Sequence, residues 1–230
     1  MSPIAGFVVG SIVLLTLLLV AYREKDHIRH YIRCKRAPAE GMSGMPTPTH
    51  VLRQVARALD RLPFADYTLV DLGCGQGEFL GHAHGRFARA VGVELDPVTA
   101  ERARARFAGA IADKGAGKGA VEIVTGDMTE YQFGPGPQVV YLYEPLWQMA
   151  KEDALPVYER LFDSLAAQLE PGSYVIYVSG VRPLLDHQFF ARAGGRRFRV
   201  RERRFRVRER RRIARDVGYR ANQLYVLAVE

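Results

Sequence analysis

Three motifs that combine glycine with an acidic residue carry residue types that could bind a nucleotide-like ligand. The first, DLGCGQG, begins at Asp71 and has glycines at Gly73, Gly75 and Gly77. Glycines let a backbone pass close to a ligand, and the N-terminus of a following helix favours a ligand carboxylate. A dinucleotide-binding turn needs a small residue where this chain has Glu78, so the spacing argues against NAD.

The second motif, VGVELDP, carries Glu94, and a third, TGD, ends at Asp127. Glu94 lies 23 positions after Asp71, close to the spacing of about 20 residues at which an acidic side chain meets a ribose diol. Asp127 can accept a hydrogen bond from an adenine amino group. Each also has a simpler interpretation: Glu94 could cap a helix, and Asp127 could be a turn residue.

The elements that must position these motifs alternate between strands and helices. Continuous apolar runs predict strands at 67–73, 89–95, 120–127, 138–145 and 173–180. Helical spacing predicts helices at 50–62, from 77 onward, at 97–112 and at 155–172. This order predicts an α/β domain with a mostly parallel sheet, and the motifs fall at strand ends where such sheets bind ligands. Two last stretches, around 197–209 and at 222–230, are predicted to pair antiparallel.

In this order, DLGCGQGEF, GVELDP and GDM resemble the nucleotide-binding motifs of class I S-adenosylmethionine-dependent methyltransferases. The resemblance covers roughly residues 46–230. It implies a Rossmann-like methyltransferase sheet of seven strands, with the last strand antiparallel, and S-adenosyl-L-methionine as the cofactor. It also implies that Asp71 and the three glycines hold the methionine part, Glu94 the ribose hydroxyls and Asp127 the adenine.

The residues after the fourth strand are candidates for the methyl acceptor site. Amino-methylating relatives often have Asn/Asp-Pro-Pro-Tyr there, and this chain has Glu-Pro-Leu in VVYLYEPLW, a loose match. An amine must lose a proton before it attacks, so Glu144 is predicted to accept that proton or hold the amine, with Tyr143 shaping the pocket. Alternatively Tyr141, Tyr143 and Trp147 only pack. No metal site is predicted, because the six histidines show no ligand spacing.

Residues 1–22 carry no charged side chain and are long enough to span a bilayer core of about 30 Å. An uncleaved transmembrane anchor is favoured over a signal peptide, because no basic residue precedes the apolar run. Residues 23–48 are interpreted as a basic juxtamembrane segment and linker, and 49–230 as the methyltransferase domain. The basic flank predicts that the domain lies on the cytoplasmic side or its organellar equivalent.

Three function classes remain open. The first is a membrane-anchored methyltransferase that N-methylates a protein lysine or another amine near the membrane. This architecture resembles the membrane-anchored protein-lysine methyltransferases of mitochondria and their bacterial relatives. The second is a nucleic-acid methyltransferase that uses the Arg-rich segment 196–212, where RRFRVRE occurs twice in tandem. The third is a non-catalytic cofactor-binding adaptor.

The expected partners are membrane lipid and a protein or small-molecule methyl acceptor. An Arg-rich stretch in an anchored protein has an anionic lipid surface as its nearest partner. Nucleic acid is the less favoured partner, because only Phe198 and Phe205 interleave the arginines as stacking aromatics.

Overall fold

The computed structural model describes the central domain and parts of both flanks. The described residues are 12–19, 22, 47, 49–60, 64–108, 119–146, 149–179, 185, 189, 198–204 and 224–230. Several segments of interest lie outside these residues. They are most of the predicted anchor, nearly all of the juxtamembrane segment and linker, Trp147, and the part of the second RRFRVRE copy that follows Arg204.

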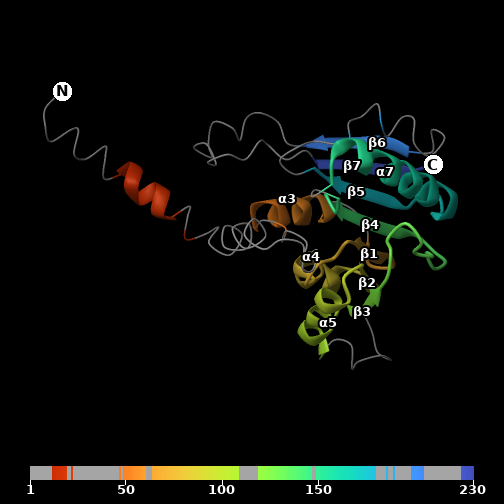
Figure 1. The fold of residues 1–230 in the computed structure, drawn as a ribbon, viewed down its shortest axis with the longest axis horizontal. Coiled ribbons are helices and arrows are strands. Elements are labelled where there is room, and N and C mark those ends of the chain that lie inside the picture. The colour runs from red at the N-terminus through yellow and green to blue at the C-terminus, as the bar shows by residue number, and fades with distance from the viewer. Residues whose placement is uncertain are drawn as a thin grey trace, which may run out of the picture.

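One twisted sheet forms the centre of the domain (Figure 1). Its strands are β1 (Thr68–Leu72), β2 (Arg89–Glu94), β3 (Ala120–Thr125), β4 (Gln138–Tyr143), β5 (Tyr174–Val178), β6 (Phe198–Arg204) and β7 (Leu224–Val229). Their spatial order is β3-β2-β1-β4-β5-β7-β6. The first five strands run parallel, whereas β7 is antiparallel to both β5 and β6. This confirms the predicted mostly parallel sheet with an antiparallel C-terminal pair.

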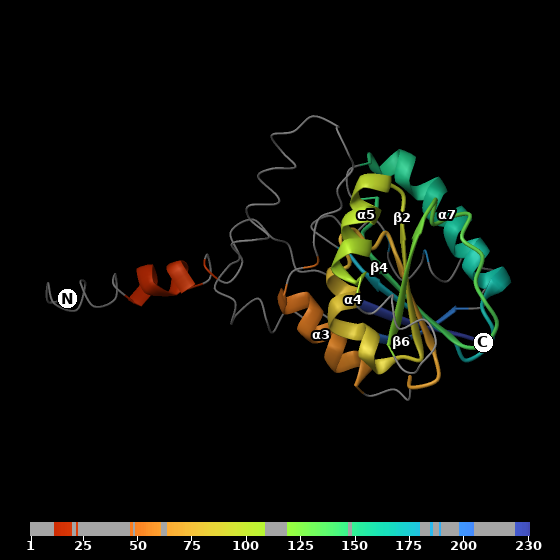
Figure 2. The same ribbon diagram turned by 90° about the horizontal axis from the view of Figure 1, so that it is seen from below.

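Helices cover both faces of the sheet (Figure 2). On one face lie α3 (Thr49–Leu59), α4 (Glu78–Ala83), the short 3₁₀ helix η1 (His84–Arg86) and α5 (Pro97–Arg106). On the other face lies α7 (Lys151–Gln168). Each face has its own buried apolar core, one under α3, α4 and α5 and the other under α7. The sheet is therefore buried on both sides, which explains why its strands appear in the sequence as continuous apolar runs.

Helix α7 begins at Lys151, earlier than the predicted start at 155. Its first turn carries Glu152 and Asp153, which the positive end of the helix dipole favours, and Ala154 is fully buried. Pro156 lies inside the helix and has no N–H to donate. The predicted start was wrong: proline is most easily accommodated at the first helical positions, but here Pro156 lies beyond the first turn.

Strand β6 departs from a simple alternation of inward and outward residues. Its pairing with β7 shifts register between Val200 and Glu202, so Arg201 forms an irregularity of the β-bulge type. This bulge interrupts the regular pairing of β6 with β7.

The part of the N-terminal run that the structure describes is helical over residues 12–19. Its large apolar side chains are 50–61% exposed: Ile12, Val13, Leu14, Leu15, Leu17, Leu18 and Leu19. Within the described ranges, no helix has the length and apolar character that a membrane crossing requires.

Candidate functional site

The glycine turn after β1 is fixed to the end of β2 by backbone hydrogen bonds. The N–H groups of Gly73 and Cys74 both donate to the carbonyl of Val93, at 2.8 and 3.0 Å. The N–H of Gly77 donates back to the carbonyl of Cys74 at 2.9 Å. The turn therefore keeps one shape beside the carboxyl ends of β1 and β2.

The three glycines of the turn have different reasons to lack a side chain, although all have positive φ. A Cβ on Gly73 would lie 2.8 Å from the Cβ of Pro145, so this glycine lets the β4 loop approach. A Cβ on Gly77 would lie 2.5 Å from the Phe107 ring, so this glycine serves packing. Near Gly75 the closest atom is a Glu78 carboxylate oxygen at 3.9 Å, which leaves room for a ligand.

Glu94, at the end of β2, links the glycine turn to the start of α5. Its carboxylate accepts hydrogen bonds from the N–H of Gly75 at 2.9 Å and of Asp96 at 3.0 Å. The cap of α5 is Asp96, which accepts from the N–H and hydroxyl of Thr99. Glu94 therefore does not cap the helix, and its carboxylate faces the glycine turn.

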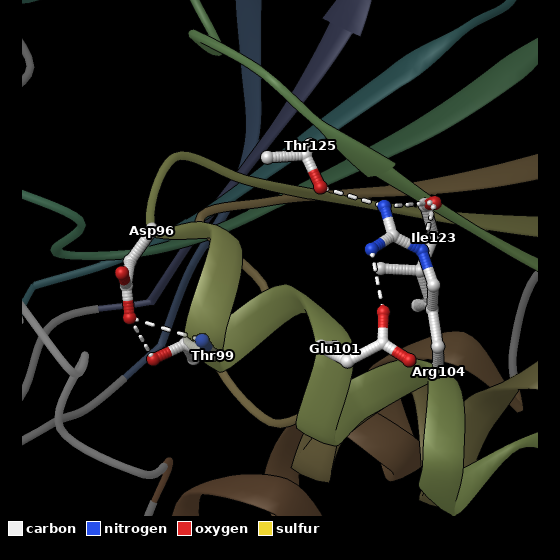
Figure 3. A network of polar contacts seen from close by, with 6 residues as sticks. All are labelled: Asp96, Thr99, Glu101, Arg104, Ile123 and Thr125. Atoms are coloured by element: carbon white, nitrogen blue, oxygen red, sulfur yellow. Dashed lines mark hydrogen bonds and ion pairs between the residues drawn. The ribbon is translucent and has the colours of Figure 1, made fainter.

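A second network holds the end of β3 (Figure 3). Arg104 of α5 donates to the carbonyl of Ile123 and to the hydroxyl of Thr125, and it pairs with Glu101. Asp127, two residues beyond Thr125, accepts from the N–H and hydroxyl of Thr129 at 2.8 Å. Asp127 thus forms a local turn, as its simpler interpretation predicts, while it also lies at the rim of the cavity described next.

A cavity of about 280 Å³ lies along the carboxyl ends of β1, β2, β3 and β4. Seven of the eight predicted site residues line it: Asp71, Gly73, Gly75, Glu94, Asp127, Tyr143 and Glu144. Gly77 does not line it, because it faces Phe107 at the N-terminus of α4. The fold therefore brings together motifs that are up to 73 positions apart in the sequence.

Negative charge is concentrated at the glycine-turn end of this cavity. Burial raises the pKa of the Asp71 carboxyl well above its usual range, and the charges of Glu78 and Glu94 raise it further. Burial also raises the pKa of Glu94, against the opposing effect of the N–H groups of Asp96 and Gly75. A bound group with positive charge relieves both effects, so this end of the cavity suits an ammonium or sulfonium group.

The β4 end of the cavity centres on Glu144. Its side chain is only 5% exposed, its N–H donates to the carbonyl of Val178, and its φ is 36°. A positive φ at a residue other than glycine is strained, and such strain collects at functional sites. Burial raises the pKa of Tyr158, and the negative charge of Glu144 raises it further.

The remaining walls contain residues outside the predicted set of ligand-binding residues. Tyr141 is 1% exposed, stacks on Phe79 at 3.6 Å and lies 3.4 Å from the hydroxyl of Thr47, and all three line the cavity. Leu95 and Met128, which directly follow the second and third motifs, line the ligand end. Four residues form the wall beyond Pro145: Leu146, Met149, Val157 and Arg160. Of these wall residues, only Leu95 and Met128 could have been predicted from the sequence, because each directly follows an acidic residue of a motif.

A family model described as a methyltransferase domain matches residues 69–172, the segment that contains all of these motifs. Residues 69–172 therefore form a methyltransferase domain. No protein of curated function matches the methyltransferase in sequence.

Solved structures with this fold include three methyltransferases of different kinds. Geranyl diphosphate C-methyltransferase from Streptomyces coelicolor A3(2), in complex with S-adenosyl-L-homocysteine, is 18% identical with a TM-score of 0.57, and the match covers 80% of this chain and 81% of that one. An RNA methyltransferase from Salinibacter ruber, also with S-adenosyl-L-homocysteine, is 23% identical with a TM-score of 0.52, covering 80% and 93%. The N-methyltransferase NodS from Bradyrhizobium japonicum WM9 is 14% identical with a TM-score of 0.55, covering 77% and 95%. These likenesses show the shared fold.

The residues of the methyltransferase fit S-adenosyl-L-methionine. Gly75 leaves space where a side chain would intrude, and Asp71 and Glu94 supply buried negative charge to a ligand that carries an ammonium and a sulfonium. Apolar Leu95 and Met128 flank the end where the resemblance puts the adenine. Among the described residues, no group of three His, Cys, Asp or Glu side chains is placed to hold a metal ion.

Proposed function

We propose that this methyltransferase transfers the methyl group of S-adenosyl-L-methionine to an amine nitrogen, on a protein lysine or another amine, and that Glu144 holds that nitrogen. The observation that carries the proposal is the placement of Glu144. A buried carboxylate with a strained backbone lines the cavity beside Tyr143, at the end of the strand next to the glycine turn. A carboxylate is the natural partner of an ammonium and can form a charge-assisted hydrogen bond with it.

Each predicted residue has a role in this proposal. Glu94 takes the ribose hydroxyls, Asp127 takes the adenine amino group, and Asp71 and the glycine turn hold the methionine end. The bound cofactor supplies a methyl group that is already activated on a sulfonium sulfur. Alignment of nitrogen, methyl carbon and sulfur then provides most of the acceleration.

Glu144 acts on the acceptor in two ways. It fixes the nitrogen by a hydrogen bond, and it takes the proton that an ammonium must lose before its nitrogen has a lone pair to form the new N–C bond. The pair of electrons in the broken S–C bond stays on sulfur. Tyr143, half-buried at the end of β4, shapes the opening through which the amine enters.

The substitution Glu144→Gln tests this role, because the amide keeps the size of the side chain but loses its charge. We expect methyl transfer to fall by about 100-fold or more, with cofactor affinity by calorimetry within about twofold of wild type. Glu152→Gln, an exposed acid on α7 outside the cavity, is the matched control and should keep full activity.

The acceptor atom is tested with methyl-labelled cofactor and a cell extract separated into protein, lipid, small-molecule and nucleic-acid fractions. Label in methylated amines that disappears with Glu144→Gln supports the proposal. Label on oxygen, carbon or a nucleic-acid base contradicts it. Cofactor binding with no label in any fraction favours a non-catalytic adaptor.

The proposal also includes a membrane location, with the catalytic domain on the cytoplasmic side or the organellar equivalent. The uncharged run 1–22, the basic block 23–36 and the exposed leucines of helix 12–19 support this. Full-length protein should resist carbonate extraction from membranes, and the double variant Leu15→Arg, Leu18→Arg should be extracted. Full-length protein that is recovered in the soluble fraction would count against a membrane location.

A further inference from the structure

The wall of the cavity that α7 contributes differs from the rest in charge. Among the residues that the structure describes, five carboxylates line the cavity: Asp71, Glu78, Glu94, Asp127 and Glu144. Arg160 is the single basic residue in the same described lining. It comes from α7, three positions after Val157, so both side chains lie on the same face of that helix.

Arg160 has no acidic partner among the residues that the structure describes. Arg104 and Arg106, on the other side of the sheet, pair with Glu101 and Glu78 at 3.1 and 3.7 Å. Within the same described part of the chain no such ion pair involves Arg160, and its side chain is exposed. A guanidinium at a cavity mouth keeps its five donors available for an anionic group, which it can bind through two parallel hydrogen bonds.

The residues that accompany Arg160 in this wall are apolar. Leu146, Met149 and Val157 line the same part of the cavity, and Met149 is 38% exposed. The acceptor end thus combines one buried carboxylate, apolar walls and one exposed cation. A ligand that matches all three has an amine at one end, a short apolar chain, and an anionic group at the other end.

We infer that the methyl acceptor is a small molecule whose amine is joined to an anionic group, a carboxylate or a phosphate, and that Arg160 selects for that group. This inference rests on the proposed function, because it takes Glu144 as the partner of the amine. The anionic group can belong to a free metabolite or to a lipid headgroup, since the chemistry that Arg160 recognises is the same. Binding of the anion positions the amine but takes no part in the bond changes.

The test compares pairs of amines that differ only in the anionic group. One series consists of ω-amino carboxylates with two to six methylene groups, matched with alkylamines of the same length. A second pair is phosphoethanolamine and ethanolamine, with phosphatidylethanolamine vesicles as the lipid form. Methyl transfer from labelled cofactor to each compound gives a ratio of kcat/KM, anionic over neutral, for every pair.

We expect the wild-type ratio to exceed one by roughly tenfold for the pair of best length, and to fall toward one with Arg160→Gln. Arg160→Glu should bring the ratio below one. The preference should also weaken with added salt in the wild type, because Arg160 is exposed, and this salt dependence should be lost in Arg160→Gln. Lys151→Gln removes a charge from the same helix outside the cavity and should keep the wild-type ratio.

The other outcomes separate the two proposals. A ratio near one in the wild type, or a ratio that Arg160→Gln leaves unchanged, overturns the selection by Arg160. Methylation of lysine in proteins with none of the small amines methylated overturns the small-molecule acceptor but keeps the amine chemistry. Label on no amine of any kind, while the cofactor binds, overturns the proposed function itself. Phosphatidylethanolamine labelled in preference to phosphoethanolamine identifies the lipid source.

Discussion

The two ends of the cavity are built in different ways. The cofactor end is held by hydrogen bonds between neighbouring strand ends: Gly73 and Cys74 donate to Val93, and Gly75 donates to Glu94. Its charges are carboxylates. The acceptor end is formed by the strained residue Glu144 and by side chains from α7, among which Arg160 is the only base that the described residues contribute to the lining.

This difference in construction matches the function of each end, which is to bind the cofactor at one and the methyl acceptor at the other. A sulfonium cofactor is the same molecule in every enzyme that uses it, so the residues around it can follow one pattern of types and spacings. The acceptor varies between enzymes, and the residues that contact it come from whichever helix covers the last parallel strands. The cofactor end therefore identifies the class of enzyme, whereas the acceptor end carries the information about the substrate.

The largest effect is expected where the two ends touch, at Gly73. The substitution Gly73→Ala places a Cβ at φ +78°, 2.8 Å from the Cβ of Pro145. Left-handed strain contributes about 1–2 kcal/mol and overpacking a further 1–3 kcal/mol, roughly. We expect the free energy of unfolding to fall by about 2–5 kcal/mol in denaturant titrations.

Cofactor binding and methyl transfer should both decline in Gly73→Ala, because Pro145 carries Glu144 with it when it moves. Gly85→Ala is the matched control, since a Cβ at that position meets no atom within 4 Å and the φ of Gly85 is not positive. If Gly73→Ala lowered cofactor affinity but left the acceptor reaction of bound enzyme unchanged, the two ends would be independent of each other.

The cofactor end could be predicted from the sequence because each of its motifs is local. Asp71, Glu94 and Asp127 lie at or just beyond the carboxyl ends of strands, and the carboxyl ends of parallel strands meet at one edge of a sheet. The role of Gly77 was less predictable. This glycine makes room for the ring of Phe107, which lies 30 positions further along the sequence, and the glycine spacing of the turn does not indicate that contact.

The acceptor end was predicted only in part. Tyr143 and Glu144 were found because they lie at the carboxyl end of a strand, in the same way as the cofactor motifs. Arg160 and Val157 were not, since on the sequence they are ordinary positions of an amphipathic helix. Which face of α7 reaches the cavity depends on how that helix packs across β4 and β5, and this is a property of the tertiary structure. The bulge in β6 was missed for the same reason.

A smaller effect, confined to the cofactor end, is expected for Glu94→Ala. This variant removes the acceptor of the Gly75 and Asp96 N–H groups as well as the proposed partner of the ribose hydroxyls. Cofactor affinity should fall by on the order of 1–3 kcal/mol by calorimetry. The exposed Glu101→Gln on α5 is a control that should bind the cofactor normally. An unchanged affinity in a folded Glu94→Ala protein would remove Glu94 from the ribose site.

The smallest effect is expected at Asp71, whose negative charge destabilises the folded protein but favours binding of the cofactor. Its pKa in the folded protein is raised, mainly by burial and then by Glu78 and Glu94, so the folded state binds this proton more tightly than the unfolded chain. The stability that this proton contributes is therefore complete below the unfolded pKa, which is about 3.9 for Asp, and is lost as the pH rises through the folded pKa. At neutral pH, above the unfolded pKa, the Asp71 carboxyl therefore opposes folding unless a cationic ligand is bound.

Asp71→Asn keeps the shape of the side chain and removes this charge. We expect the cofactor-free variant to melt above the wild type at about pH 7.5, by about 2–4 °C for each kcal/mol recovered, and the difference to shrink as the pH approaches about 4.

The same variant should bind S-adenosyl-L-methionine more weakly, because the ammonium end loses a charged partner. Thermal melts across that pH range, with and without the cofactor, measure both effects. Because the charges of Asp71 and Glu94 repel each other, the difference between the two proteins also includes the relief of Glu94. A variant that melts below the wild type at neutral pH would mean that the carboxylate of Asp71 stabilises the fold, and that the cofactor end does not hold its negative charge at the expense of stability.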